Sequence, residues 1–274
     1  MTQIPDVTLN DGRTIPQFGL GVFLMEPGET ERIVSEALEL GYRHIDTAAI
    51  YKNEAEVGAA IAKSGIPRDE LYITTKLWNA RQTDAHTAMR ESLDKLQLDR
   101  VDLYLIHWPT PEKDTYVGAW LDLEEVQAQG LATSIGVSNF MPEHLDKLVA
   151  QSSVVPAINQ IEIHPTLQQR DAVAANEKFG IVTESWSPLG RGKADDLTSP
   201  AVTEIAAAVG KTPAQVVLRW HVQKGYVVFP KSSRRERLEE NMRIFDFSLA
   251  DDQMAAIDGL EAGTRVGPDP RTFN

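Results

Sequence analysis

The sequence predicts a (β/α)8 barrel, the TIM-barrel architecture, because short apolar runs alternate eight times with segments of helical periodicity. The chain has 274 residues, close to the ~250 residues that are usual for this fold. Hydrophobic residues make up 42% of it, which is enough for a sizeable core. No linker rich in proline, glycine or serine and no low-complexity tract divides the chain. We therefore expect residues 1–274 to form a single barrel domain.

Strands are expected where an apolar run precedes a segment of helical spacing. In chain order they cover residues 18–21, 44–46, 71–75, 101–106, 134–137, 157–161, 181–184 and 226–229. Each run is followed by apolar residues three or four positions apart, such as Ile33, Ala37 and Leu40 in the first segment. The expected helices cover residues 29–40, 53–63, 84–96, 116–129, 142–150, 171–179, 200–224 and 234–244.

A short hairpin is expected ahead of the first barrel strand. Residues 7–16 hold an Asp11-Gly12 pair between two short β-type runs. This dipeptide favours a tight hairpin turn, because its residues tolerate a positive φ. Since it precedes the first strand, we expect the N-terminal β-hairpin to cap the barrel floor.

The composition excludes several classes of function. Lys and Arg total 27 against 40 for Asp and Glu, a net charge of −13, so we expect neither a nucleic-acid partner nor a membrane partner. The chain has no cysteine and no HExxH motif, so we expect no metal site and no thiolate nucleophile. It shows no basic and apolar leader and no run near ~20 apolar residues. We expect a cytoplasmic monomer that acts on a small molecule.

Polar side chains with useful chemistry stand at the carboxyl ends of the expected strands, where such barrels hold their active sites. Asp46, Lys76 and His107 end the second, third and fourth strands. Tyr51 follows Asp46 by five residues. Taken singly, Asp46 and Lys76 could be a structural ion pair and His107 a core residue. Taken together, the four residues suit a carbonyl substrate.

The chemistry of this set is proton delivery to a polarised C=O group. The phenol of Tyr51 has an ordinary pKa near ~10, and the Lys76 cation would favour its ionisation. His107 could donate a hydrogen bond to the carbonyl oxygen. No side chain supplies a hydride, so a reductase would require a nicotinamide cofactor.

Two further features favour a flat ligand that carries phosphate. Trp78, Trp108 and Trp186 fall at strand ends, where large apolar side chains suit a pocket for a flat molecule. Residues 231–237, between the last strand and its helix, contain four cations and one acid. Cations at a helix N-terminus oppose the helix dipole, which favours a bound phosphate over a merely charged barrel rim.

The usual nucleotide and hydrolase motifs are incomplete. Residues 19–24 lack the third glycine of G-x-G-x-x-G. Residues 136–140 lack the last glycine of G-x-S-x-G, which argues against a serine hydrolase.

The chain resembles the aldo-keto reductase superfamily, and within it the bacterial diketo-gluconate reductase-like members. The matching motifs follow the family's order and spacing and are Gly41-Tyr42-Arg43-His44-Ile45-Asp46-Thr47-Ala48 with Tyr51, Thr75-Lys76-Leu77-Trp78, residues 102–109, Gly136-Val137-Ser138-Asn139-Phe140, Asn159-Gln160 and Pro230-Lys231-Ser232. The resemblance implies that Tyr51 is the general acid of a carbonyl reductase and that Lys76 and Asp46 tune it. It implies that His107 orients the carbonyl group.

The resemblance also implies NADPH/NADP+ as the cofactor, extended across the barrel. The residues implied to hold the nicotinamide are Trp186 against the ring and, at the carboxamide, Ser138, Asn139 and Gln160. The pyrophosphate would pass Ser187, Leu189 and Gly190. The residues implied at the adenosine end are Lys231, Ser232, Arg234 and Arg237 for the 2′-phosphate, and Glu240 and Asn241 for the adenine edge.

The substrate pocket implied by the resemblance consists of Phe23, Ile50, Trp78 and Trp108. The loop after His107 and the tail from residue 263 are short, so we expect a rather open pocket. Such a pocket favours small aldehydes, dicarbonyls or keto-sugars. Two other interpretations stay open: a Schiff-base lyase that uses Lys76 as its nucleophile, and a module that binds NADP(H) as a redox sensor.

Overall fold

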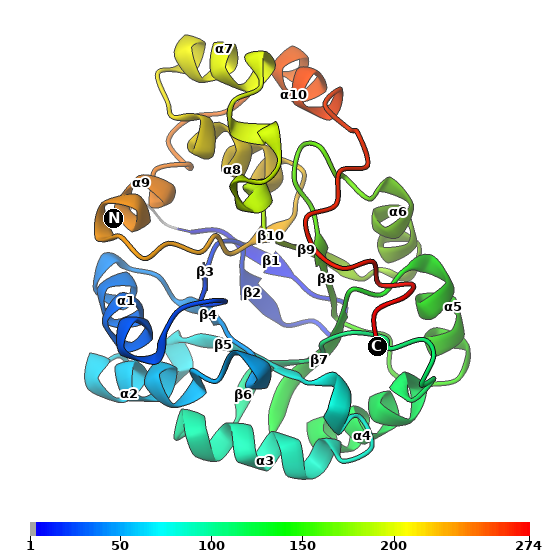
Figure 1. Ribbon diagram of the computed structural model, residues 1–274. Helices are drawn as coiled ribbons and strands as arrows, with labels where there is room; N and C mark the ends of the chain where they lie inside the picture. The colour runs from blue at the N-terminus through cyan, green and yellow to red at the C-terminus, as the bar shows by residue number, and fades with distance from the viewer. Residues whose placement is uncertain (1–3) are drawn as a thin grey trace.

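The computed structural model describes residues 4–274, in which eight parallel strands form a barrel surrounded by helices (Figure 1). The strands are β3 (Leu20–Gly21), β4 (His44–Asp46), β5 (Tyr72–Leu77), β6 (Val101–Ile106), β7 (Ala132–Ser138), β8 (Ile158–Glu162), β9 (Val182–Trp186) and β10 (Val227–Val228). Neighbours in the barrel are neighbours in the sequence. The barrel closes where Phe18 pairs with Val228 and the Gly19 amide donates to the Val228 carbonyl at 2.9 Å. The predicted (β/α)8 architecture is confirmed.

Helices follow the strands and cover the outside of the barrel (Figure 1). They are α1 (Pro27–Leu40), α2 (Glu54–Ser64), α3 (Ala85–Leu96), α4 (Tyr116–Ala128), α5 (Pro142–Ala150), α6 (Arg170–Phe179), α7 (Pro200–Val209), α8 (Pro213–Gln223), α9 (Arg235–Met242) and α10 (Asp251–Asp258). Short 3-10 helices are η1 (Ala49–Tyr51), η2 (Arg68–Glu70), η3 (Asn79–Arg81), η4 (Gly190–Gly192) and η5 (Asp195–Leu197). In the part of the chain that the structure describes, no helix has the length and apolar character needed to cross a membrane.

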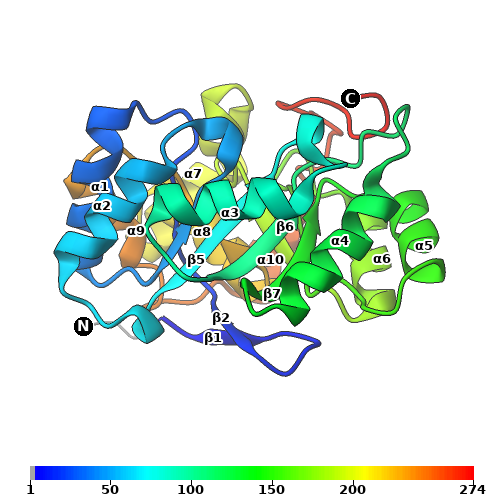
Figure 2. The ribbon, with the colours of Figure 1, turned by 90° about the horizontal axis from the view of Figure 1, so that it is seen from below.

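The N-terminal hairpin closes one end of the barrel, as predicted. Strands β1 (Asp6–Thr8) and β2 (Thr14–Pro16) pair antiparallel. Leu9 and Ile15 from this hairpin are buried against Leu103 and Ile158 of the barrel strands. Figure 2 shows the hairpin on one side of the barrel and the C-terminal tail on the other. The carboxyl ends of the strands therefore remain the open end.

The segment expected as one helix over residues 200–224 is two helices, so that prediction was wrong. Gly210, with a φ of +66°, ends α7. Thr212 then caps α8 by accepting a hydrogen bond from the Gln215 amide at 3.3 Å, and Pro213 takes the first helical position. The helix α10 was not expected; Asp258 at its end accepts a hydrogen bond from the Trp220 indole of α8 at 2.8 Å.

The interior of the barrel changes from apolar to polar along the strands. Side chains two residues apart on a strand point the same way. On β8, Ile158 packs near the hairpin, whereas Gln160 lies one layer higher and bonds to Asp46 of β4. On β6, Leu105 belongs to the apolar layer and His107 follows the strand at the open end. The polar layer is where the candidate site lies.

Candidate active site

A cavity of about 680 Å³ opens at the carboxyl ends of the strands. All four residues predicted for the substrate pocket line it, namely Phe23, Ile50, Trp78 and Trp108. Asp46, Tyr51 and His107 also line it, whereas Lys76 is fully buried and lies outside its wall. The structure thus brings the predicted pocket residues and the polar set together around one space.

The core of the site is a buried ion pair between neighbouring strands. Asp46 ends β4 and pairs in register with Thr74 of β5, so Lys76 lies one step further along the same face. The Lys76 Nζ donates to Asp46 Oδ1 at 2.6 Å and to the Thr47 carbonyl at 2.8 Å. It also lies 5.2 Å from the centroid of the Tyr51 ring, which η1 brings back over the strand ends.

Tyr51, in turn, lies next to His107. The centroids of the two rings are 5.7 Å apart, in an edge-to-face arrangement. Trp78 also packs against His107, with ring centroids 5.4 Å apart. The phenol, the imidazole and the apolar wall are therefore held in mutual contact.

The environment sets the protonation of these three groups. Burial alone would lower the pKa of Lys76, but the Asp46 carboxylate raises it above its ordinary value. Burial lowers the pKa of His107 well below its usual range, and the Lys76 charge adds to this. Burial raises the pKa of Tyr51, an effect that Lys76 opposes but does not outweigh. At neutral pH the site holds a charged amine, a neutral imidazole and a protonated phenol.

The structure adds a second and larger influence on the Tyr51 phenol. We expected the Lys76 cation to favour the ionised form of Tyr51. Lys76 does act in that direction, yet removal of the phenol from water has the larger effect. The phenol therefore keeps its proton at neutral pH, and the nearby Lys76 cation lowers the cost of losing it.

A second buried carboxyl, Glu184, was missed by the sequence analysis. The Gln160 Nε2 donates to Asp46 Oδ2 at 2.8 Å and to Glu184 Oε2 at 3.0 Å. Burial, followed by the Asp46 charge, raises the pKa of Glu184 to about 8. The sequence did hold a signal for it, because Glu184 is an acidic residue inside the strand expected over residues 181–184. Because both hydrogens of the Gln160 amide are used here, its carbonyl oxygen is the atom left for the cavity.

The residues predicted for the nicotinamide end form a connected shelf. The Ser138 Oγ donates to the main-chain carbonyl of Gln160 at 2.8 Å, and the Asn139 Nδ2 donates to the main-chain carbonyl of His107 at 3.0 Å. The Trp186 indole donates to Asn139 Oδ1 at 2.8 Å. Asn139 has a φ of +64°, a conformation that asparagine tolerates better than most side chains. These bonds fix Trp186 at the edge of the cavity.

The residues predicted along the rest of the cofactor are only partly at the cavity wall. Ser187, Leu189 and Lys231 line it. Gly190, with a φ of +62°, is not part of the wall. The other residues outside the wall belong to α9 and the turn before it, and they are Ser232, Arg234, Arg237, Glu240 and Asn241.

Within this turn, the cations differ in what they contact. Lys231, Arg234 and Arg237 have exposed side chains, and across residues 4–274 none of the three takes part in an ion pair. Arg235 instead pairs with Glu39 of α1 at 2.8 Å. Glu240, predicted at the adenine edge, is less available to a cofactor, because its Oε1 already accepts a hydrogen bond from the Thr212 hydroxyl at 2.6 Å.

The wall also contains residues that sequence analysis did not assign. Arg191 lies with its guanidinium 5.1 Å from the Trp186 ring centroid and 5.0 Å from that of Phe23. Phe273, near the end of the chain, packs on Trp108 with ring centroids 4.6 Å apart. Pro268 lines the cavity beside it. The tail therefore contributes part of the cavity wall, which the sequence did not predict.

Comparison with known proteins agrees with this geometry. A sequence model described as the Aldo/keto reductase family matches residues 17–262. Methylglyoxal reductase DkgA of Yersinia pestis is 51% identical over 273 residues, covering 100% of this chain and 99% of that protein. Methylglyoxal reductase DkgA of Escherichia coli (strain K12) is 48% identical over 267 residues, covering 97% of each.

Solved structures show the same fold. A variant of Gox0644 crystallised in complex with NADPH matches with a TM-score of 0.95 and 44% identity, covering 100% of both chains. The Bombyx mori aldo-keto reductase in complex with NADP matches with a TM-score of 0.91 and 37% identity, covering 98% of this chain and 96% of that one. In the present chain, the four polar residues at the carboxyl ends of the strands, here called the tetrad, are Asp46, Tyr51, Lys76 and His107. With sequence identity to these relatives sustained over the whole chain, the chain belongs to the aldo/keto reductase family.

Proposed function

We propose that this chain is an NADPH-dependent carbonyl reductase that converts small aldehydes, dicarbonyls or keto-sugars to alcohols. The observation that carries the proposal is the buried Lys76–Asp46 ion pair beneath the protonated phenol of Tyr51, beside a neutral His107. The methylglyoxal reductases among its relatives support a dicarbonyl as substrate.

The residues around the cavity fit the cofactor. The shelf of Ser138, Asn139 and Gln160 presents amide and hydroxyl groups at one end, and Lys231 lines the other. Arg234 and Arg237 add exposed cations beyond Lys231 that are free to meet a phosphate. When bound, NADPH supplies the hydride, which no side chain of the protein can provide.

The chain's own residues then handle the carbonyl oxygen. A neutral His107 donates a hydrogen bond that orients and polarises the C=O group. Tyr51 gives its proton to the oxygen as negative charge develops there, so the product leaves as an alcohol. The Lys76 cation stabilises the phenolate left behind, and Asp46 holds Lys76 in place.

The two alternatives make different demands on the same site. A Schiff-base lyase needs a neutral amine at the cavity, but the Lys76 Nζ is fully buried, donates to Asp46 and the Thr47 carbonyl, and keeps its charge at neutral pH. A redox sensor needs only the cofactor site and has no use for the tetrad. The assembled tetrad favours the reductase over both.

The test is the loss of NADPH absorbance on addition of methylglyoxal and a panel of simple aldehydes. We expect turnover that depends on the carbonyl compound. Tight NADPH binding without turnover over the whole panel would favour the sensor instead. Trapping of a carbonyl substrate on Lys76 by borohydride would favour the lyase.

Trp108 provides a test of the substrate pocket. Replacing Trp108 with leucine should change the ratio of kcat/KM between phenylglyoxal and methylglyoxal by about ten-fold or more, since one changed apolar contact is worth ~1–3 kcal/mol. The reason is that Trp108 lines the cavity and packs against Phe273, which lines it as well. NADPH affinity, measured by fluorescence titration, should change by less than about three-fold.

The matched control is Trp120→Leu, which removes a buried tryptophan of α4 that does not line the cavity. It should lower the urea midpoint and leave the substrate ratio unchanged. If Trp108→Leu behaves in the same way, Trp108 is a packing residue and the pocket assignment is wrong.

A further inference from the structure

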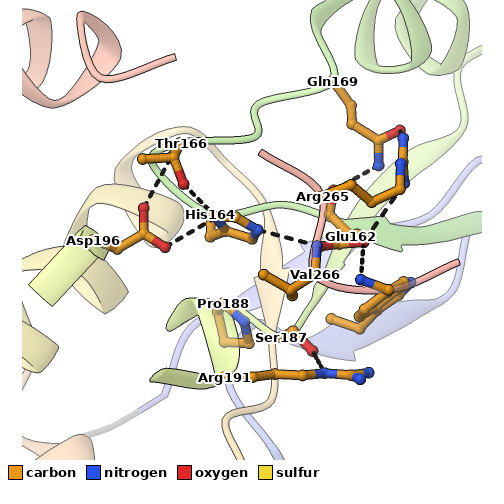
Figure 3. A network of polar contacts seen from close by, with 12 residues as sticks. Glu162, His164, Thr166, Gln169, Ser187, Pro188, Arg191, Asp196, Arg265 and Val266 are labelled. Atoms are coloured by element: carbon orange, nitrogen blue, oxygen red, sulfur yellow. Dashed lines mark hydrogen bonds and ion pairs between the residues drawn. The ribbon is translucent and has the colours of Figure 1, made fainter. Parts of the chain in front are cut away.

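A buried polar network lies behind the cavity and joins two segments that form its walls (Figure 3). Its centre is Glu162, the last residue of β8, whose side chain is fully buried. The carboxylate accepts hydrogen bonds from the amides of Val266 at 2.6 Å and Gly267 at 3.1 Å. Arg265 pairs with it at 3.6 Å. Glu162 therefore anchors the C-terminal tail, here defined as residues 263–274.

The tail is anchored directly against the predicted nicotinamide shelf. A Cβ added at Gly267 would lie 2.4 Å from the Trp186 ring and 3.1 Å from Glu162 Oε2. Glycine is thus required for the tail backbone to approach the indole so closely. Beyond this point the tail brings Pro268 and Phe273 to the cavity. The position of the substrate wall follows from the anchoring of residues 265–267.

The network continues from Glu162 to the opposite wall through His164. The His164 Nε2 lies 3.2 Å from Glu162 Oε1, and its Nδ1 lies 2.9 Å from Asp196 Oδ2. Asp196 also accepts a hydrogen bond from the Thr166 amide at 2.9 Å. Burial alone would lower the pKa of His164, but Asp196 and Glu162 outweigh it and raise the pKa to about 9. The imidazolium is therefore held between two carboxylates.

Asp196 lies near the end of residues 187–197, which form the second wall and are called the 187–197 segment below. This segment brings Ser187, Leu189 and Arg191 to the cavity. It folds tightly on Asp196, because a Cβ added at Gly190 would lie 2.3 Å from Asp196 Oδ2. Figure 3 shows Asp196 at one end of the network and Arg265 and Val266 of the tail at the other, with Ser187 and Arg191 below. The Arg191 Nε donates to Ser187 Oγ at 2.7 Å.

We propose that Glu162, His164 and Asp196 are positioning residues that couple the C-terminal tail to the 187–197 segment, so that the two walls of the cavity are ordered together. The physical reason is that buried charges cannot be separated singly: release of either carboxylate leaves an unpaired charge out of water. The assignment of one wall to substrate and the other to cofactor rests on the proposed function; the coupling does not.

The test uses a change on one wall and a measurement on the other. Asp196→Asn keeps an acceptor for the Thr166 amide but removes the charge that faces His164. Within residues 4–274, Asp196 makes no hydrogen bond or ion pair with the tail itself. Apart from the path through His164, it reaches the tail through Thr166, whose carbonyl accepts the Thr264 amide at 3.0 Å. A merely local role therefore predicts no effect at the Val266 and Gly267 amides. We expect hydrogen exchange at the Val266 and Gly267 amides of the isolated protein to accelerate by about ten-fold, within the range of typical coupling energies.

The matched control is Asp195→Asn, which makes the same chemical change at the neighbouring residue of η5, where the side chain is exposed. The exchange of the Ile106 amide in β6 reports global stability and should be the same in both variants. Equal tail exchange in Asp195→Asn and Asp196→Asn would overturn the proposal.

Coupling is reciprocal, which gives a second and independent test. Arg265→Leu removes the tail's ion pair with Glu162 and should accelerate exchange at the Thr198 and Ser199 amides, which close η5 on the Asp195 carbonyl. Arg271→Leu removes a tail ion pair with Glu143 of α5 instead and should leave those amides unchanged. No difference between the two arginine variants would also overturn the proposal.

A kinetic measurement links the coupling to the cavity. Asp196→Asn should raise the KM for phenylglyoxal by about ten-fold while kcat changes by less than about three-fold, because the tetrad is untouched and only the wall is loosened. The exchange experiments use neither substrate nor cofactor. If the protein shows the exchange pattern but fails to reduce carbonyls, the proposed function is wrong and the coupling stands. If it reduces carbonyls but does not show the exchange pattern, only the coupling is wrong.

Discussion

The Tyr51→Phe variant is expected to lose nearly all carbonyl reduction, with kcat lower by ~10²–10⁴, the usual contribution of general acid catalysis. Phenylalanine keeps the ring that lies 5.2 Å from the Lys76 Nζ and 5.7 Å from the His107 ring, so the packing of the site is preserved. Only the proton donor is removed. The rate of NADPH oxidation with methylglyoxal measures the effect.

NADPH affinity of this variant should stay within about three-fold of the unmodified protein, because Tyr51 is assigned to the substrate and not to the cofactor. The matched control is Tyr104→Phe. Tyr104 is fully buried in β6 and, within residues 4–274, its hydroxyl has no hydrogen-bond partner. That variant should turn over normally. Near-normal turnover in Tyr51→Phe as well would remove Tyr51 as the general acid.

The second large effect is on cofactor choice. Unmodified protein should bind NADPH at least about ten-fold more tightly than NADH, because a charge-assisted contact is worth ~1.5–3 kcal/mol and ~1.4 kcal/mol is a factor of ten. Arg237→Ala should weaken NADPH binding by about ten-fold and change NADH binding little. The exposed position of Arg237 means that added salt should also reduce the preference. Fluorescence titration with each cofactor is the measurement.

Arg235 offers the control for this experiment. It lies two residues before Arg237 on the same turn, but its guanidinium pairs with Glu39 at 2.8 Å. Arg235→Ala should therefore change the affinity for both cofactors by less than about three-fold. Equal affinity of the unmodified protein for NADPH and NADH at low salt would disprove the phosphate site, even if Tyr51 proved to be the acid.

The fold and the centre of the site could be read from local patterns. The alternation of apolar runs with helical spacing predicted the eight strands, and the Asp11-Gly12 turn predicted the hairpin. Because parallel strands of a barrel all end on one side, the positions of Asp46, Lys76 and His107 after their strands already predicted a common site. The register of β4 and β5 then brought Asp46 and Lys76 to 2.6 Å, as that reasoning required.

Local patterns failed where a weak helix-end signal competed with a strong apolar periodicity. Apolar spacing ran through residues 200–224 and hid the break, although Gly210 and Pro213 both marked it. Burial also changed the chemistry of single groups in ways that residue type does not show. Glu184 became a buried carboxyl with a pKa of about 8, and desolvation outweighed Lys76 at the Tyr51 phenol.

The sequence by itself determined which faces are buried and where each strand ends, because these depend on residues only a few positions apart. Tertiary structure alone decided which distant segments come together to form the cavity wall. Glu162 accepts the Val266 amide across 104 positions of sequence, and Phe273 reaches Trp108 at 4.6 Å. Contacts between segments so far apart are set by the curvature and closure of the whole barrel, which no local periodicity encodes.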